Sequence, residues 1–318
     1  MTTALARSSQ PSALKQGLTG TARCPQGIGL CLFDLDGTIL AHHQGISPRV
    51  VAAIKMLQDH GVATAVCSGR PRGLIEGPAA DAECMDYYVT ANGACIADGN
   101  LAPLVRRPIE RDDALRIYQA FKPLRAAWHV HLGMDTYAEA GAISYMAGQT
   151  ERRSGSALDI LKGFVSHPIF RLKGWHNCLS ALPKLKSAED GIEKLDCSFP
   201  VPENMKAAER ILEREGIWEV AEMEKTQIEI TKKGVTKGTG ADALAAYLGI
   251  PKEAVVAFGD GGNDIPLIGH VGHFVAMGNA SDDVKALADE ICPSIDEDGV
   301  AVWIEAALEE AHAPAKEA

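Results

Sequence analysis

The sequence predicts an α/β protein: a parallel-sheet core encoded in two pieces, with an α+β domain inserted between them. Apolar strand-like runs alternate with amphipathic helical stretches over residues 27–95, and this alternation indicates βαβ units. The same alternation returns over residues 231–312. Residues 96–230 instead contain closely spaced strands, hairpin turns and at least two helices. Because loops in compact domains are much shorter than this, we expect the inserted stretch to fold as a cap.

Each element of the first piece has a local signal. Residues 28–34 form an apolar run and are predicted as the first strand. Ser47 then supplies the N-cap of a helix that Gly61 ends, and residues 62–67 form a second buried strand. A strand, a helix and a strand in this order predict parallel pairing through a right-handed crossover. Residues 85–89 are expected to form the third strand.

The inserted stretch and the second piece continue this pattern. A hairpin is predicted around Asp98-Gly99, because this dipeptide separates two apolar runs. Further elements of the insert are helices over residues 111–121 and 203–215 and strands over 128–132, 136–140, 195–199, 217–223 and 227–231. In the second piece we expect helices over 236–248, 282–290 and 299–309 and strands over 254–258 and 274–276.

Composition narrows the class of protein. The 318 residues are 46% hydrophobic and 23% charged with a net charge of −11, which is typical of a soluble globular chain. An acidic chain without a Lys/Arg-rich block is a poor binder of nucleic acid or anionic lipid, and no apolar run approaches the roughly 18 residues of a membrane helix. We therefore expect neither nucleic acid nor membrane as a partner.

Cysteine usage and the first residues indicate the compartment. None of the eight cysteines forms a C-x-x-C pair, and a reducing, cytoplasmic location is the simplest account. Residues 1–26 are rich in Ser, Thr, Gly and Gln, and no acidic residue precedes Asp34. We interpret them as a disordered N-terminal tail, although the composition also has some features of a transit peptide.

Two aspartates directly follow the first strand. Asp34 and Asp36 are two positions apart, so both side chains point to the same side at the carboxyl end of a buried strand. Open α/β sheets bind their ligands at this edge. Two such close carboxylates repel each other and need a cation or a shared proton, and hard oxygen ligands favour Mg²⁺. The alternative is an Asp-Gly turn that simply ends the strand.

Two later motifs offer groups to a phosphate. Ser68, Gly69 and Arg70 follow the second strand, and they present a hydroxyl and backbone N–H groups. Lys237 stands in the first turn of a predicted helix, where its charge opposes the helix dipole. It is therefore either solvated or directed at an anion. For the motif at Ser68, the alternative interpretation is that Ser-Gly is simply the start of an ordinary loop.

A glycine-rich turn after a later apolar strand completes the set. Asp260, Asn263 and Asp264 occur within residues 258–264, where so many polar side chains are costly as pure structure. If this cluster meets the first two aspartates, the carboxylates together form a Mg²⁺ site.

Taken in order, these four motifs resemble those of the haloacid dehalogenase superfamily. The position of the insert and the strings at residues 90–94 and 233–238 resemble its Cof-like, cap-type IIB sugar-phosphatase branch. The resemblance covers roughly residues 28–95 and 232–310 and implies a Rossmann-like core with a cap of C2 type B. Ser68 departs from the pattern, since this family more often has threonine there, but serine keeps the hydroxyl.

The resemblance implies a role for each matched residue. Asp34 would be the nucleophile that forms an aspartyl-phosphate, Asp36 the general acid and base, and Lys237 the cation that offsets negative charge. The residues expected to bind the phosphoryl group or substrate are Ser68, Gly69, Arg70 and Asn263. Mg²⁺ would be held by Asp34, the carbonyl of Asp36, Asp260 and Asp264.

The predicted function is a Mg²⁺-dependent phosphatase for small phosphorylated metabolites, with sugar phosphates favoured by the branch. A phosphotransferase such as a hexose phosphomutase and a non-catalytic phosphometabolite-binding protein are the alternatives, although an intact set of motifs argues against the latter. In the insert, His129 and His131 share one strand face and are candidates for contacting the substrate, but single histidines are more often ordinary surface or core residues. The oligomeric state and the substrate itself do not follow from the sequence.

Overall fold

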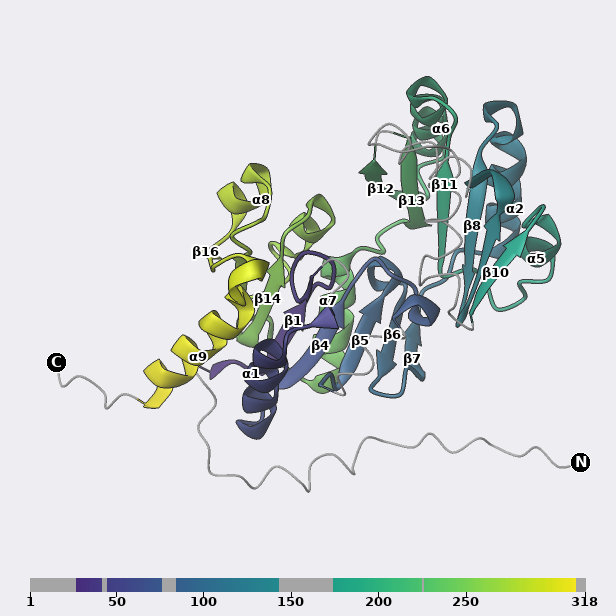
Figure 1. Ribbon diagram of the computed structural model, residues 1–318. Helices are drawn as coiled ribbons and strands as arrows, with labels where there is room; N and C mark the ends of the chain where they lie inside the picture. Colours follow the sequence, from purple (N-terminus) through teal and green to yellow (C-terminus); the bar gives the residue numbers. More distant parts are fainter. Residues whose placement is uncertain (1–26, 42–44, 76–83, 143–173, 225, 313–318) are drawn as a thin grey trace, which may run out of the picture.

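The computed structural model describes residues 27–41, 45–75, 84–142, 174–224 and 226–312 (Figure 1). The predicted tail, residues 1–26, lies outside the described residues. The described chain forms two large sheets, each with its own helices, and it crosses from one body to the other and back (Figure 1). We refer to the body of the first sheet as the core and to the body of the second sheet as the cap.

The core sheet has eight strands, and the predicted βαβ pattern forms most of it. In sheet order the strands are β16 (Glu290–Ile291), β15 (His273–Ala276), β14 (Val255–Gly259), β1 (Leu30–Phe33), β4 (Ala63–Cys67), β5 (Tyr87–Thr90), β6 (Cys95–Asp98) and β7 (Pro103–Arg106). Pairing is parallel from β16 to β5 and antiparallel for β6 and β7. Buried strands on both sides of β1 explain why its sequence is apolar throughout.

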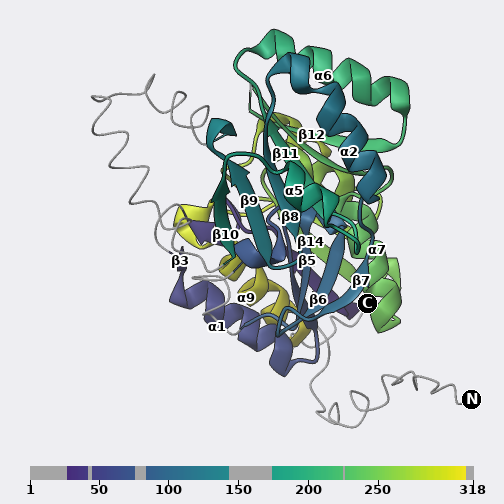
Figure 2. The ribbon, with the colours of Figure 1, turned by 90° about the vertical axis from the view of Figure 1, so that its right-hand side faces the viewer.

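Helices cover both faces of the core sheet. Helices α1 (Pro48–Asp59) and α9 (Gly299–His312) pack together on one face, and α7 (Lys237–Leu248) lies on the other (Figures 1 and 2). Ser47 caps α1 as predicted, because its hydroxyl accepts a hydrogen bond from the amide of Val50 at 3.2 Å. The short helix α8 (Asp282–Leu287) precedes β16. No helix in the described ranges is long and apolar enough to cross a membrane.

The cap contains a six-stranded sheet with helices on one face (Figure 2). In sheet order the strands are β10 (Trp175–Cys178), β9 (Asp135–Glu139), β8 (Ala127–Leu132), β11 (Lys194–Ser198), β13 (Gln227–Lys232) and β12 (Trp218–Glu224). The helices are α2 (Arg111–Ala120), α5 (Leu182–Lys186) and α6 (Pro202–Glu215). Apolar residues of α2 and α6 and alternate residues of the strands form one core, separate from that of the first sheet.

The structure moves one predicted boundary and adds one element. The hairpin β6–β7 pairs with β5 and extends the core sheet to Arg106, whereas the sequence assigned residues 96 onward to the insert. A hairpin signal is local and does not say which sheet the hairpin joins, which is why the prediction failed here. Strands β2 (Leu40–Ala41) and β3 (Gly45–Ile46) form an additional short antiparallel ribbon directly after the first motif.

A buried ion pair connects the core to the cap. Glu193, which precedes β11, is fully buried and accepts a hydrogen bond at 2.9 Å from Arg72 in the loop after β4. Arg106 of β7 lies 3.5 Å from the same carboxylate oxygen. One acidic side chain of the cap therefore contacts two arginines of the core, and these contacts exist only while the two bodies stay together.

We expect Glu193→Ala to lower the free energy of unfolding by about 3 kcal/mol, because it leaves a buried arginine without its partner. Urea unfolding of the full chain measures the change. Glu305→Ala, which breaks the exposed pair with Arg49, is the control and should leave the midpoint nearly unchanged. A Glu193→Ala protein as stable as this control would show that the pair does not hold the two bodies together.

Candidate active site

The two predicted aspartates lie at the carboxyl end of β1, in the middle of the core sheet. Asp34 is 5% exposed, and its amide donates a hydrogen bond to the carbonyl of Phe258 in β14 at 3.0 Å. Gly37 has a φ of +87°, and a Cβ atom there would lie 2.3 Å from a carboxylate oxygen of Asp260. Only glycine allows the chain after β1 to turn this close to the second acidic motif.

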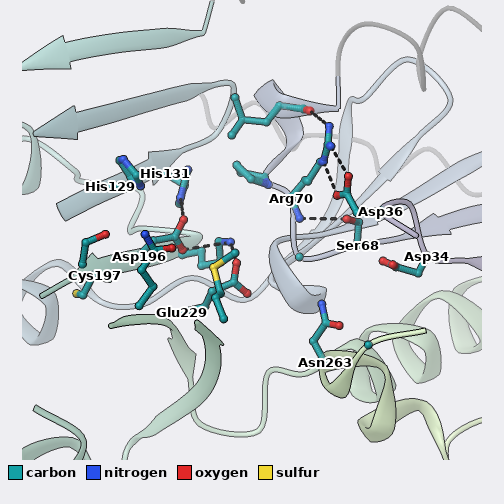
Figure 3. A pocket seen from close by; sticks show the side chains of 18 of the residues that line it. Asp34, Asp36, Ser68, Arg70, His129, His131, Asp196, Cys197, Glu229 and Asn263 are labelled. Carbon is teal, nitrogen blue, oxygen red and sulfur yellow. Dashed lines mark hydrogen bonds and ion pairs between the residues drawn. The ribbon is translucent and has the colours of Figure 1, made fainter. Parts of the chain in front are cut away.

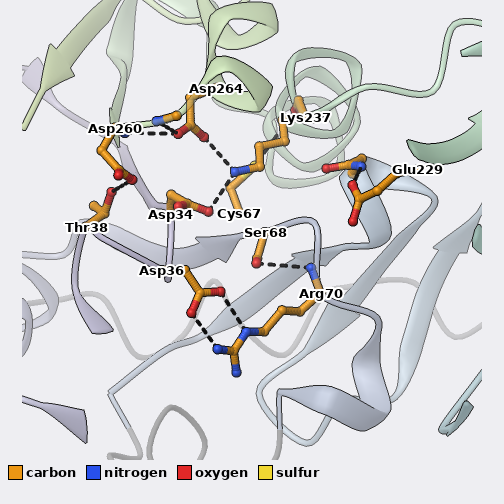
Figure 4. A network of polar contacts seen from close by, with 12 residues as sticks. Asp34, Asp36, Thr38, Cys67, Ser68, Arg70, Glu229, Lys237, Asp260 and Asp264 are labelled. Carbon is orange, nitrogen blue, oxygen red and sulfur yellow. Dashed lines mark hydrogen bonds and ion pairs between the residues drawn. The ribbon is translucent and has the colours of Figure 1, made fainter. Parts of the chain in front are cut away.

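Lys237 joins the first and last motifs by direct contact. Its ammonium donates to Oδ1 of Asp34 and to Oδ1 of Asp264, at 2.6 Å in each case (Figure 4). The other carboxylate oxygen of Asp264 accepts hydrogen bonds from the backbone amides of Asp260 and Gly261, each at 3.0 Å. Lys237 is the first residue of α7, as predicted, and its buried ammonium faces these carboxylates rather than solvent.

Burial and mutual repulsion shift the pKa values of this cluster. Burial raises the pKa of Asp34 to about 7, although Lys237 opposes this shift, and burial together with Asp264 raises the pKa of Asp260 to about 6. For Lys237, burial alone would lower the pKa, but Asp264 and Asp34 raise it above its ordinary value. One ammonium therefore does not neutralise the three carboxylates.

The donor set of this cluster fits a hard divalent cation. Carboxylate oxygens of Asp34, Asp260 and Asp264 lie within 4.8 Å of one another. Thr38 donates from its hydroxyl to Oδ1 of Asp260 at 3.1 Å and orients that carboxylate toward the others (Figure 4). Oxygen ligands and a negative charge that Lys237 leaves uncompensated are the features that such a cation requires.

The motif that the sequence predicts to bind phosphate lies beside the aspartates, at the end of β4. Ser68 is 3% exposed, and its hydroxyl accepts a hydrogen bond from the amide of Arg70 at 3.2 Å. The guanidinium of Arg70 donates to both carboxylate oxygens of Asp36, at 2.8 and 2.5 Å (Figure 4). Asp36 thus points away from Asp34 and is held by Arg70 (Figure 4). The prediction that both side chains point to the same side was wrong, because β1 ends at Phe33 and both aspartates lie beyond the strand.

A cavity of about 350 Å³ connects these residues to the cap. Its core side is lined by seven predicted site residues, namely Asp34, Asp36, Ser68, Gly69, Arg70, Asp260 and Asn263. Figure 3 shows Asn263, Ser68 and Asp34 at one end and the histidines of β8 at the other. The other two predicted residues, Lys237 and Asp264, do not line the cavity: Lys237 contacts Asp34, and Asp264 contacts Lys237.

Two further residues link this site to the cap, and the sequence analysis assigned a role to neither. The side chain of Asn92 donates to Glu229 of β13 at 2.5 Å, and both side chains pack against Gly69. Asn92 has φ and ψ of 54° and 33°, and its amide donates to the carbonyl of Ser68 at 3.1 Å. Asn92 belongs to the string at residues 90–94 that resembles the family, so the sequence did mark this position. The sequence could not show that its partner is Glu229, which lies on a strand far away in the chain.

A buried thiol adjoins the site. Cys67 ends β4 directly before Ser68, and burial raises its pKa to about 12. Among the described residues, all seven cysteines are free of disulfide bonds.

The fold and this site define a known family. A family model described as haloacid dehalogenase-like hydrolase matches residues 31–304. The chain therefore belongs to this family, and the predicted family, fold class and enzyme class are confirmed: the protein is a phosphatase with an α/β core and a cap domain.

Similar proteins include both sequence relatives and solved structures. The 5-amino-6-(5-phospho-D-ribitylamino)uracil phosphatase YwtE of Bacillus subtilis is 28% identical over 291 residues, which cover 87% of this chain and 96% of that protein. A haloacid dehalogenase-like hydrolase from B. subtilis has a TM-score of 0.74 at 23% identity, covering 87% of this chain and 99% of its own. The subclass IIB sugar phosphatase BT4131 has a TM-score of 0.69 at 23% identity, covering 87% and 98%.

In metal-free buffer the protein should lose stability as the pH rises from about 4 to 7. The folded-state pKa values of Asp34 and Asp260, about 7 and 6, exceed the value of about 3.9 in unfolded chains. The folded state therefore binds more protons in this range, and the stability present at pH 4 is lost as the two groups ionise.

Urea unfolding in EDTA across this pH range tests the shift. Asp260→Asn removes one titrating group and one repulsion, so its stability should fall less than that of the wild type. Asp59→Asn at the exposed end of α1 is the control and should follow the wild-type curve. Equal slopes for all three proteins would contradict the assigned cause.

Proposed function

We propose that the protein is a Mg²⁺-dependent hydrolase of small phosphorylated metabolites, sugar phosphates among them, and that it acts through a phosphate ester of Asp34. One observation carries the proposal: a buried carboxylate, held by a buried lysine, lies at the end of a cavity with phosphate-binding groups beside it. A carboxylate in this position would serve as the nucleophile that attacks phosphorus.

The first step would be attack by Asp34. The oxygen that is not bound to Lys237 forms a bond to phosphorus while the bond from phosphorus to the leaving alcohol breaks. Lys237 opposes the rise in the pKa of Asp34 that burial causes, and it would offset the charge that accumulates on the phosphoryl oxygens. Ser68 and the backbone amides after it would bind these oxygens.

Asp36 would transfer the protons. It would donate one to the leaving oxygen and then remove one from the water that attacks the aspartyl-phosphate, which regenerates Asp34 and releases phosphate. In the structure its carboxylate is held by an ion pair with Arg70. A bound phosphoryl group offers Arg70 a second anionic partner, and this weakens its hold on Asp36 when the proton is needed.

A magnesium ion would be held by Asp34, Asp260 and the carbonyl of Asp36, with Asp264 bound to it or orienting it. Bound there, it would neutralise negative charge on the carboxylates and the phosphoryl group. The uncompensated charge of the three carboxylates supports its presence.

The relatives support a small substrate. YwtE is named for a phosphorylated ribitylaminouracil and BT4131 for sugar phosphates. Both names describe a phosphate on a hydroxyl-rich carbon chain or ring. A phosphomutase on the same core would release an isomer of the substrate, whereas the proposed hydrolase releases inorganic phosphate.

Asp34→Asn should reduce turnover of p-nitrophenyl phosphate by about 10³-fold or more, because the amide keeps the size but not the nucleophilic charge. Phosphate release measures the loss, and the melting temperature establishes that the variant is folded. Asp59→Asn serves again as the surface control. A folded Asp34→Asn protein with a near-native rate would rule out this nucleophile.

Addition of Mg²⁺ to the metal-free protein should restore turnover and raise the melting temperature. At a concentration 100 times its dissociation constant, a ligand stabilises the folded state by about 2.7 kcal/mol. Asp260→Asn should show a much smaller thermal shift than the wild type. Full turnover in excess EDTA, or an equal shift in both proteins, would argue against a magnesium site at these residues.

A further inference from the structure

The cap sheet has one polar face, and it is the face without helices. Along β8, β11 and β13 the side chains alternate, as those of a strand must. One set is apolar and packs under α2 and α6, and it includes Trp128, Val130, Leu195, Ile228 and Ile230. The other set includes His129, His131, Lys194, Asp196 and Glu229, and these five line the cavity.

Strand register places these polar residues side by side. Asp196 of β11 pairs with His129 on one side and with Glu229 on the other, and Lys194 pairs with His131. Lys194 contacts Glu229 and lies 3.1 Å from Asp196. The other oxygen of Asp196 is 2.8 Å from Nε2 of His131, whose Nδ1 bonds Thr136 at 2.9 Å.

These groups are almost completely enclosed. Lys194, His131, Glu229 and His129 are between 1% and 8% exposed. Removing charges from water is energetically costly, and apolar side chains would be easier to bury at these positions. A buried polar face that lines the same cavity as Asp34 is therefore best explained by a ligand that it binds.

His129 is the group of this face that is available to a ligand. Its Nε2 is buried and has no hydrogen-bond partner among the described residues, while its ring packs against Trp175 with centroids 5.4 Å apart. Burial lowers its pKa to about 4, so the ring is uncharged at neutral pH. An uncharged imidazole offers a hydrogen bond to a hydroxyl or amide, but no charge to an anion.

The charges on this face are unfavourable for a second anion. Lys194 is one positive charge between two carboxylates, Asp196 and Glu229, so the three together are negative. Burial would lower the pKa of Lys194, but both carboxylates raise it, and its charge is therefore retained and already paired. The cation at the opposite end of the cavity, Arg70, is paired with Asp36.

We propose that His129, Lys194 and Asp196 form the specificity site for the alcohol part of the substrate. The site accepts monophosphates whose alcohol is uncharged and rich in hydroxyl or amide groups, and it rejects those with a second phosphate. This inference rests on the proposed phosphatase function, because it assigns the other end of the cavity to the phosphoryl group that is transferred.

The test compares two substrates that differ by one phosphate. The full-length protein with Mg²⁺ should hydrolyse fructose 6-phosphate with a kcat/KM about tenfold or more above that for fructose 1,6-bisphosphate. Asp196→Asn removes one negative charge and should reduce this preference at least about threefold. His129→Phe keeps a ring but removes the proposed hydrogen bond to the substrate. The variant's decrease in kcat/KM for fructose 6-phosphate should therefore exceed its decrease for p-nitrophenyl phosphate about tenfold.

Two further variants show whether the effect comes from the hydrogen bond. His129→Gln restores a polar group and should recover part of the loss, mainly through KM. His176→Phe replaces a histidine of β10 outside the cavity and should leave the substrate preference unchanged. Thermal melting establishes that each variant is folded.

The outcomes separate the two proposals. A wild-type protein that hydrolyses none of the three phosphates would overturn the proposed function and this inference with it. If the wild type hydrolyses p-nitrophenyl phosphate but prefers the bisphosphate, only the inference is overturned. The inference also fails if His129→Phe behaves like His176→Phe.

Discussion

The contact between Lys237 and its two aspartates is the interaction on which the rest of the site depends. Asp34, Asp260 and Asp264 come from two strand ends and would repel each other without a cation between them. Lys237 reaches Asp34 and Asp264 from the start of a third element, α7, and its own charge is retained because they surround it. The ammonium therefore offsets part of the repulsion among the three carboxylates and holds Asp34 in place at the end of β1.

This contact constrains the topology of the core. Asp34 follows β1 and Asp260 follows β14, and parallel pairing of these neighbouring strands brings their carboxyl ends to one edge of the sheet. Helix α7 crosses the sheet so that its first residue meets that edge. The chain leaves the core for the cap after β7 and returns before α7.

The core could be predicted well from the sequence, and the cap less completely. Asp34, Ser68, Lys237 and Asp260 each follow or begin an element with a strong local signal, so their meeting follows from parallel topology alone. The pairing of the β6–β7 hairpin with the core sheet did not follow from the sequence, because a hairpin signal does not indicate which further strand the hairpin pairs with. The contacts of Lys194 depend on the register of strands far apart in sequence, which alternation alone does not determine.

The buried thiol beside the site has a consequence for tolerance of oxidants. Oxidation and alkylation of cysteine proceed through the thiolate, and both burial and a pKa of about 12 keep Cys67 in the thiol form. Its sulfur lies 3.9 Å from the carbonyl of Lys237, within the apolar layer under the site. Peroxide or iodoacetamide can therefore reach this sulfur only when the core opens, and reaction at Cys67 would report loss of the fold rather than chemistry at the folded site.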